Sequence, residues 1–228
     1  MNIGVLLAGG SGRRMGASVP KQFLPLAGRP LMEHAIRTFD ASPEIDEIFI
    51  VSNAEFLDET ANIARSSDFH KVSQILTGGS ERSDSSLAAI RATEGLADCR
   101  LLFHDIVRPL VSEELIRRVC LALDEHAAVS VAIASTDTIF RVSGDRVASV
   151  PPRSELRRVQ TPQGFRREVI AEAYRRALAD PAFQATDDCG VVLRYMPEVP
   201  VVVVEGDERN LKITHPDDIP LAEFWMSR

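Results

Sequence analysis

The stretch IGVLLAGGSGRRMGASVPKQF (residues 3–23) passes from a short apolar run through a cluster of glycines to a lysine. The apolar run at 3–8 is typical of a buried strand. Gly9, Gly10 and Gly12 follow it and let backbone amides approach a ligand closely. Parallel α/β sheets bind ligands at the carboxyl ends of their strands, so this stretch predicts such a sheet with a binding loop. Arg13, Arg14 and Lys21 add positive charge, which favours a phosphate ligand.

The rest of the chain alternates in the same way between apolar runs and amphipathic stretches. Strands are expected at 3–8, 47–51, 72–76, 101–103, 129–134 and 199–204. Helices are expected at 31–39, 55–65, 83–94, 113–125, 166–178 and 217–225. This order predicts an α/β fold with a doubly wound, mainly parallel, Rossmann-like sheet. The continuous apolar character of the strands agrees, because parallel strands are covered on both faces.

Residues 137–159 interrupt this rhythm. They alternate in polarity, contain a Ser-Gly-Asp turn and lack a helical period, so they predict a β-hairpin or arm that projects from the sheet. The length of 228 residues fits one domain, and we expect residues 1–228 to form a single unit that carries this arm.

Composition excludes several classes of partner. The net charge of −7, with scattered acids, argues against a nucleic-acid partner. The run at 3–8 is too short to span a membrane, so no membrane partner is expected. Cys99, Cys120 and Cys189 are widely spaced and form no Cys-x-x-Cys pair, which predicts neither disulfides nor zinc and favours a cytoplasmic protein.

Two familiar phosphate-binding motifs do not fit the glycine cluster. A dinucleotide fingerprint starting at Gly10 needs glycine at position 15, where Met15 stands. No acid follows the second expected strand, and no Gly-Lys-Ser/Thr follows the glycines as a P-loop requires. An NAD-dependent oxidoreductase is therefore disfavoured. The remaining alternative for the glycines is a simple chain turn beside solvated arginines.

Lysine is scarce in this chain. Lys21, Lys71 and Lys212 are three of 26 basic residues, and two of them lie in segments with other chemical features. An ammonium is a compact point charge that the guanidinium of arginine does not replace, so Lys21 and Lys212 are candidates for contact with phosphate. Chance placement is the alternative, and Lys71 is expected to be a surface charge.

Three further segments carry candidate residues. HDIVRP (104–109) places Asp105 after a strand, where a carboxylate could hold magnesium, and Arg108 could clamp a phosphate. A simple turn is an equal alternative, and His104 is expected to pack or to bond locally. GGSERSDSS (78–86) is a second glycine turn suited to a nucleoside. TDDC (186–189) is expected to begin a helix capped by Thr186 or Asp187.

Taken together and in their order, eight segments of the chain resemble the cytidylyltransferases of the 2-C-methyl-D-erythritol 4-phosphate and D-ribitol 5-phosphate type. These segments are LAGGSGRRM, PKQF, GGSERSDS, HDxxRP, DT, QTPQ, TDD and GxxxNxKxT. The resemblance runs from Ile3 to about Glu223. It implies transfer of CMP from CTP to the phosphate of a small polyol phosphate, with release of pyrophosphate and with magnesium as cofactor. It also implies a homodimer with shared active sites.

The resemblance assigns roles to matching positions. It implies that the reacting phosphates are met by Arg14, Lys21, Asp105 and Lys212, with Asp105 as the metal ligand. The nucleotide site would comprise Ala8, Gly9, Gly10, Gly12, Gly79, Ser80, Arg82 and Ser85. The acceptor would be surrounded by Arg108, Thr138, Arg153, Thr161, Thr186 and Thr214, with Thr138 and Arg153 serving the neighbouring subunit.

The acceptor itself stays open between two polyol phosphates. Gly9-Gly10, Cys189 and the run PKQFLPLAGRP look more like the ribitol phosphate branch, which is slightly favoured over methylerythritol phosphate. A non-catalytic nucleotide-binding regulator and a sugar-phosphate nucleotidyltransferase that uses UTP or GTP are the remaining alternatives. The regulator would be expected to lack the lysines at the reacting phosphate.

Overall fold

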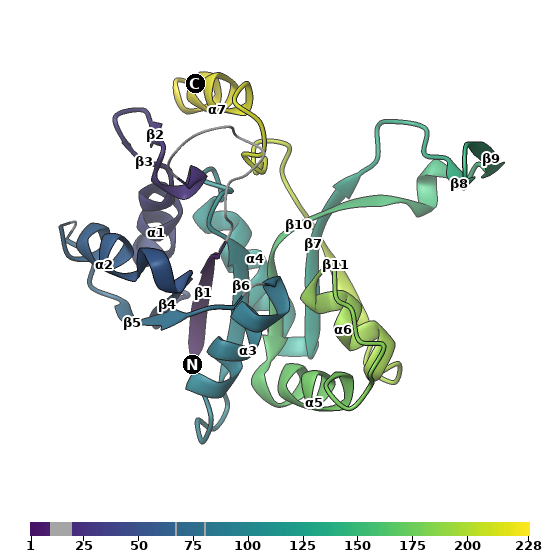
Figure 1. The fold of residues 1–228 in the computed structure, drawn as a ribbon, viewed down its shortest axis with the longest axis horizontal. Helices are drawn as coiled ribbons and strands as arrows, with labels where there is room; N and C mark the ends of the chain where they lie inside the picture. The colour runs from purple at the N-terminus through teal and green to yellow at the C-terminus, as the bar shows by residue number, and fades with distance from the viewer. Residues whose placement is uncertain (10–19, 67, 80) are drawn as a thin grey trace.

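The computed structural model describes residues 1–9, 20–66, 68–79 and 81–228. Its centre is a seven-stranded sheet in the order β11-β7-β10-β6-β1-β4-β5 (Figure 1). The strands are β1 (Asn2–Ala8), β4 (Glu47–Ser52), β5 (Val72–Thr77), β6 (Arg100–Asp105), β7 (Ala128–Ala134), β10 (Arg157–Arg166) and β11 (Val201–Glu205). All neighbouring pairs are parallel except those of β10, which runs antiparallel to β6 and β7. The predicted doubly wound, mainly parallel α/β sheet is confirmed.

Helices cover both faces of this sheet. Alternate residues of β1 enter two separate apolar clusters: Leu6 packs with α1 (Leu31–Ala41), α2 (Leu57–Ser66), α4 (Glu113–Glu125) and α7 (Asp218–Met226). Val5 packs with the other group, which contains α3 (Arg82–Ala92), α5 (Arg167–Ala177) and α6 (Asp188–Tyr195). A strand that is apolar along its whole length is buried in this way on both faces. In the described residues, every helix is too short or too polar to cross a membrane.

Short elements complete the fold. Among the described residues they include the 3-10 turns η2 (Lys21–Phe23), η3 (Ala54–Phe56) and η4 (Arg153–Glu155), and a two-stranded ribbon of β2 (Pro25–Leu26) and β3 (Arg29–Pro30). The predicted arm is present as a hairpin of β8 (Arg141–Ser143) and β9 (Arg146–Ser149) that extends away from the sheet (Figure 1). Gly144 lies in its turn with φ +60°, a conformation that favours glycine.

The largest difference from the expected elements is β10. Sequence analysis placed residues 157–159 in the arm, started a helix at 166 and assigned no structure between them, whereas these residues form one long strand next to the centre of the sheet. Pro162 cannot donate to a strand partner, and pairing with β7 is interrupted between Val159 and Gln163. The proline made the segment look unlike a strand. The strand accommodates Pro162 because the residue lies where pairing with β7 is interrupted.

Candidate functional site

The carboxyl end of β1 meets the start of α3. Ala8 is buried, and its carbonyl accepts a hydrogen bond of 2.9 Å from the side chain of Gln22. A Cβ added to Gly9 would lie 3.1 Å from Oγ of Ser85, so Gly9 and α3 are in close approach. Glu81 and Asp84 form a capping box at the N-terminus of α3. Gly9, the described residue of the first glycine segment, thus lies beside the second glycine segment at the start of α3.

Asp105 is the centre of a cluster of charged side chains. It lies at the end of β6 and is 9% exposed. Lys212 Nζ lies 2.9 Å from one of its carboxylate oxygens, Arg108 Nε lies 3.7 Å from the same oxygen, and Arg82 Nε lies 3.5 Å from the other. Three cations from three distant parts of the chain therefore converge on one carboxylate.

Burial and neighbouring charges shift the pKa values of Asp105, Arg82 and Arg108. Burial alone would raise the pKa of Asp105, but the charges of Lys212, Arg82 and Arg108 lower it well below its usual range. Burial opposes the charge of Arg82, yet Asp188 and Asp105 outweigh that effect and raise its pKa. Burial lowers the pKa of Arg108 from its usual value. The cluster is thus held ionised, with more cations than carboxylates, as a site for a polyanion requires.

Lys21 reaches the same segment that carries Lys212. It begins η2, is 9% exposed, and its Nζ donates to the carbonyl of Ile213 at 3.0 Å. The amide of Ile213 in turn donates to the carbonyl of Val107 at 2.9 Å, in the turn after Asp105. Lys21, although far from Lys212 in sequence, therefore bonds to the residue next to it.

Arg82 has a buried partner, Asp188, that the sequence did not predict. Asp188, the second acid of TDD, is fully buried, and Arg82 Nη1 lies 2.5 Å from its Oδ2. Tyr174 donates to its other oxygen at 2.7 Å. Asp187, as predicted, caps α6, and its Oδ1 accepts from the amide of Gly190 at 3.0 Å. In the sequence, Asp188 is visible only as a second acid beside a helix cap. Helix capping accounts for the TDD segment by itself, so the sequence gives no sign that Asp188 pairs with Arg82.

His104 and Thr161 are buried behind Asp105. The amide of Asp105 donates to Thr161 Oγ1 at 3.0 Å, and that oxygen lies 3.0 Å from His104 Nδ1. His104 Nε2 bonds to the carbonyl of Arg108 at 3.1 Å. Burial lowers the pKa of His104 to about 4, so the ring is neutral at neutral pH. The expectation of a local hydrogen bond for His104 is confirmed.

Asn210, the asparagine of the GxxxNxKxT segment, is a further residue of the site to which the sequence pattern assigns no role. It is fully buried, and its Nδ2 donates to the carbonyl of Thr161 at 2.8 Å. Its own carbonyl accepts from Arg108 Nη1 at 2.8 Å. Asn210 therefore joins β10, the turn after β6 and the segment that leads to Lys212.

The other predicted site residues are more dispersed. Thr186 is exposed just before α6, and Thr214 Oγ1 donates to the carbonyl of Lys212 at 3.1 Å. Thr138 and Arg153 are exposed in the arm, which extends away from β6 and β1 (Figure 1). Arg153 bonds there to the carbonyl of Thr136 at 2.8 Å. Four predicted site residues lie outside the described residues: Gly10, Gly12, Arg14 and Ser80.

The described residues offer magnesium few ligands of their own. No group of three or more His, Cys, Asp or Glu side chains comes together among them as a ready-made metal site. Magnesium is commonly held by one or two carboxylates together with substrate phosphates. The ionised carboxylate of Asp105 fits an ion that arrives with a triphosphate.

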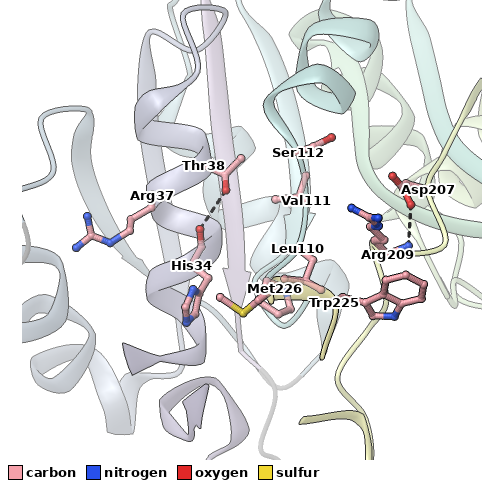
Figure 2. A pocket seen from close by; sticks show the side chains of 11 residues that line it. His34, Arg37, Thr38, Leu110, Val111, Ser112, Asp207, Arg209, Trp225 and Met226 are labelled. Carbon is pink, nitrogen blue, oxygen red and sulfur yellow. Dashed lines mark hydrogen bonds between the residues drawn. The ribbon is translucent and has the colours of Figure 1, made fainter. Parts of the chain in front are cut away.

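A separate pocket of about 440 Å³ opens between α1, the start of α4 and α7 (Figure 2). Its lining includes His34, Ser112, Arg209 and Trp225, and none of the residues that we assign to the charged cluster. Arg209 stacks on Trp225, with its guanidinium 5.2 Å from the ring centroid. This pocket is distinct from the cluster around Asp105.

Comparisons with known proteins agree on one family. The family model described as 2-C-methyl-D-erythritol 4-phosphate cytidylyltransferase matches residues 3–228. The chain is 50% identical over 227 residues to the protein of that name from Thermobifida fusca (strain YX), covering 97% of this chain and 91% of the relative. It is 41% identical over 231 residues to a bifunctional ribulose 5-phosphate reductase/CDP-ribitol pyrophosphorylase of Haemophilus influenzae, covering 100% of this chain and 48% of that protein.

Solved structures give the same result for the fold. The crystal structure of 4-diphosphocytidyl-2C-methyl-D-erythritol synthase from Anaerococcus prevotii DSM 20548 superposes with a TM-score of 0.86 at 30% identity. The match covers 100% of this chain and 98% of that one.

Proposed function

We propose that this chain, which belongs to the 2-C-methyl-D-erythritol 4-phosphate cytidylyltransferase family, transfers CMP from CTP to the phosphate of that polyol and releases pyrophosphate. As a family member it is a CTP-dependent cytidylyltransferase. The observation that carries the proposal is the convergence of Lys212, Arg82 and Arg108 on Asp105 at the strand ends. This is a cationic site for phosphate in the crevice where such sheets bind ligands.

The choice of acceptor reverses the slight preference from sequence analysis. The relative from Thermobifida fusca is named for methylerythritol phosphate, and it is more similar to this chain than the Haemophilus influenzae relative named for CDP-ribitol. Cys189, one of the features that favoured ribitol phosphate, is buried, and its thiol packs 3.9 Å from the carbonyl of Val129. A core thiol gives no reason to prefer either acceptor, and the greater similarity to the relative named for methylerythritol phosphate supports that acceptor.

The residues fit a reaction that needs no general base. A phosphate monoester is largely dianionic at neutral pH, because its second pKa is about 6, and is already a nucleophile. The task is to bring two polyanions together and to stabilise charge on the α-phosphate and the leaving pyrophosphate. Lys21 and Lys212 would serve as compact charges on the α-phosphate, and Arg14 would bind the leaving end.

Other residues would position the substrates. Ala8, Gly9, Gly79 and Ser85 would shape the cytidine site, where α3 approaches β1. Arg108, Thr186 and Thr214 would surround the acceptor. Asp105 would hold a magnesium ion, which neutralises phosphate charge when bound.

We also propose a cytoplasmic homodimer in which the arm of one subunit brings Thr138 and Arg153 to the site of the other. The arm supports this, because a lone two-stranded hairpin is marginally stable in water. It also exposes apolar side chains, among them Phe140 at 54% and Val142 at 61%. The cytoplasmic location is supported by three cysteines that form no disulfide.

A substrate matrix tests the proposed function. CTP, UTP, ATP and GTP are each combined with methylerythritol phosphate, ribitol 5-phosphate or glycerol phosphate in the presence of magnesium, and pyrophosphate release is measured. We expect the highest kcat/KM for CTP with methylerythritol phosphate. A preference for ribitol 5-phosphate would overturn the acceptor alone. Nucleotide binding without pyrophosphate release would indicate the non-catalytic regulator instead.

A further inference from the structure

We propose that Gln160 and Asn210 are positioning residues that hold Lys212 in place at the reacting phosphate. This inference deepens the proposed function and rests on it, because Lys212 meets that phosphate only if the chain catalyses the proposed reaction. It concerns two uncharged side chains outside the set of expected site residues. One lies at the irregularity of β10, and the other lies in the segment that follows β11.

Gln160 lies where β10 leaves its regular pairing with β7. Residues 160–162 are outside the register of these two strands. Gln160 and Thr161 are nevertheless buried, so their polar groups need partners other than a neighbouring strand. The partners come from residues 207–212, the segment that ends at Lys212.

Two side-chain amides join the two segments reciprocally. Gln160 Nε2 donates to the carbonyl of Asp207 at 2.8 Å, and Asn210 Nδ2 donates to the carbonyl of Thr161 at 2.8 Å. Asn210 Nδ2 also lies 3.4 Å from Gln160 Oε1. A carbonyl only accepts, so the orientation of each amide is determined by its backbone partner. Each segment thus supplies one side-chain donor to the backbone of the other.

The packing around this pair of amides is close. A Cβ added to Gly206 would collide with Gln160 Oε1. The amide of Gly206 donates to the carbonyl of Ala132 at 2.9 Å, which fixes Gly206 beside β7. Gln160 is 4% exposed and Asn210 is fully buried. A side chain of another shape or polarity at position 160 would therefore displace the segment that follows β11.

That segment carries one cation of the site and binds another. Asn210 lies two residues before Lys212, whose Nζ lies 2.9 Å from Asp105, and the carbonyl of Asn210 accepts from Arg108 Nη1 at 2.8 Å. The Lys212 side chain is 41% exposed, so burial does not fix its place and the backbone beside it must do so. A misplaced charge reduces the rate more than it reduces ground-state binding, because the charge to be stabilised grows in the transition state.

The first test replaces the amide of Gln160. Gln160→Met keeps the length of the side chain and removes its hydrogen bonds. We expect kcat to fall by about 5- to 50-fold, with KM for CTP and for the acceptor each changed by less than about threefold. The matched control is Glu208→Ala, because Glu208 pairs with Arg158 across the same two segments but on the exposed surface. It should leave kcat within about twofold of wild type. Unchanged kcat in Gln160→Met, or a raised KM alone, would overturn the inference.

A second background tests whether Gln160 acts through Lys212. Lys212→Arg replaces the ammonium whose place Gln160 is proposed to fix. Gln160→Met should therefore lower kcat by less than about threefold in Lys212→Arg, a smaller loss than in wild type, because both changes disturb one contact. An equal fold-loss in the two backgrounds would contradict the inference, since a general effect on the fold is independent of the group at position 212.

A substrate-free measurement separates this inference from the proposed function. The amide of Ile213 donates to the carbonyl of Val107 at 2.9 Å, so its hydrogen exchange reports whether the segment stays in place. Exchange should be faster in Gln160→Met than in wild type or Glu208→Ala. Gly206→Ala, which displaces Gln160 but leaves both amides in the chain, should act in the same direction. Unchanged exchange in both variants would overturn the positioning role. If wild type releases no pyrophosphate with any substrate pair, the proposed function fails, and the exchange result still decides whether Gln160 holds the segment.

Discussion

At the scale of single residues, the chemistry of the site depends on whether a cation is an ammonium or a guanidinium. Lys212 is paired with Asp105, while Arg82 and Arg108 approach the same carboxylate. Lys212→Arg keeps the charge but replaces a compact group with a broad fork in a space already shared by two others. We expect kcat to fall by about 10-fold or more, equivalent to at least about 1.4 kcal/mol of transition-state stabilisation.

The matched control for this variant is Lys71→Arg. Lys71 donates to the carbonyl of Ser42 at 2.6 Å and precedes the edge strand β5, which β1 and β4 separate from β6, so the same exchange should leave turnover near wild type. Steady-state kinetics with saturating CTP measure both variants. Equal activity of the two would show that charge alone, and not its shape, is required at position 212.

A second residue-scale prediction concerns His104 and stability at mildly acidic pH. Burial lowers its pKa to about 4, whereas an unfolded histidine titrates near 6.5, so the unfolded state binds more protons between these values. Stability should therefore fall as pH decreases through this window, by about 2 kcal/mol from pH 7 to pH 5 for this group. Urea unfolding at both pH values measures the difference, and His104→Asn should reduce it by that amount.

The exposed residue His70 provides the control, with His70→Asn compared over the same pH range. The quantity to compare is the change between pH 7 and pH 5, because His104→Asn is also expected to lower stability at both. An unchanged pH dependence in His104→Asn would mean that another group accounts for the acid sensitivity.

The charged residues of the site were easier to predict from the sequence than the buried residues that hydrogen-bond to them and fix their positions. Asp105, Arg108 and Lys212 stand next to expected strand ends or in scarce lysine positions, and the structure brings them together. Asp188 and Asn210 are fully buried, and each bonds to a cation of the cluster, Asp188 to Arg82 and Asn210 to Arg108. Their partners are far away in sequence, so no spacing along the chain could reveal them.

At the scale of elements, β10 shows why some strands were predicted from the sequence and this one was not. The parallel strands were visible as apolar runs, because helices cover both of their faces. β10 contains polar residues, Gly164 and Pro162, yet it lies between β6 and β7. Gln163 is fully buried there because its side chain bonds to Asp187 and to the amide of Asp188. Tertiary partners, not local propensity, make this segment a strand.

Gly164 gives a prediction for the packing of β10 against α4. A Cβ at this position would lie 2.8 Å from Leu123 Cδ1 and 2.9 Å from Val119 Cγ1, in an apolar layer without free space. We expect Gly164→Ala to destabilise the protein by about 1–3 kcal/mol through overpacking. Chemical denaturation measures the loss.

A compensating substitution distinguishes overpacking from an effect on the strand itself. Val119→Ala removes a methyl group that meets the new Cβ, so Gly164→Ala/Val119→Ala should be more stable than the sum of the single effects predicts. The control is Gly95→Ala, at a glycine with φ +86° and no atom near its Cβ, where the cost comes from the backbone and not from packing. Strict additivity in the double variant would contradict the packing explanation.

At the scale of the whole molecule, the arm projects from the sheet and leaves apolar side chains exposed in a single chain. Among the described residues its strands pair with each other alone, and its apolar side chains are exposed. The hairpin of β8 and β9 projects away from the sheet (Figure 1). Exposed apolar groups on a projecting element are typical of a partner surface, and the partner that we propose is a second copy of the chain. The pattern of residues 137–159 predicted the hairpin, but only the resemblance gave it a role in a dimer.

Subunit mixing tests whether the active site is shared between two chains. Arg153→Ala and Lys21→Ala should each be nearly inactive alone, because one lacks the arm residue and the other lacks a cation of the sheet. In a mixed dimer, one of the two sites combines an intact sheet with an intact arm, so random mixing should restore about one quarter of wild-type activity. The control mixes two chains that both carry Lys21→Ala, with mixed dimers verified by differently tagged subunits. No recovery in verified mixed dimers would mean that each chain builds its own site and that the arm serves assembly alone.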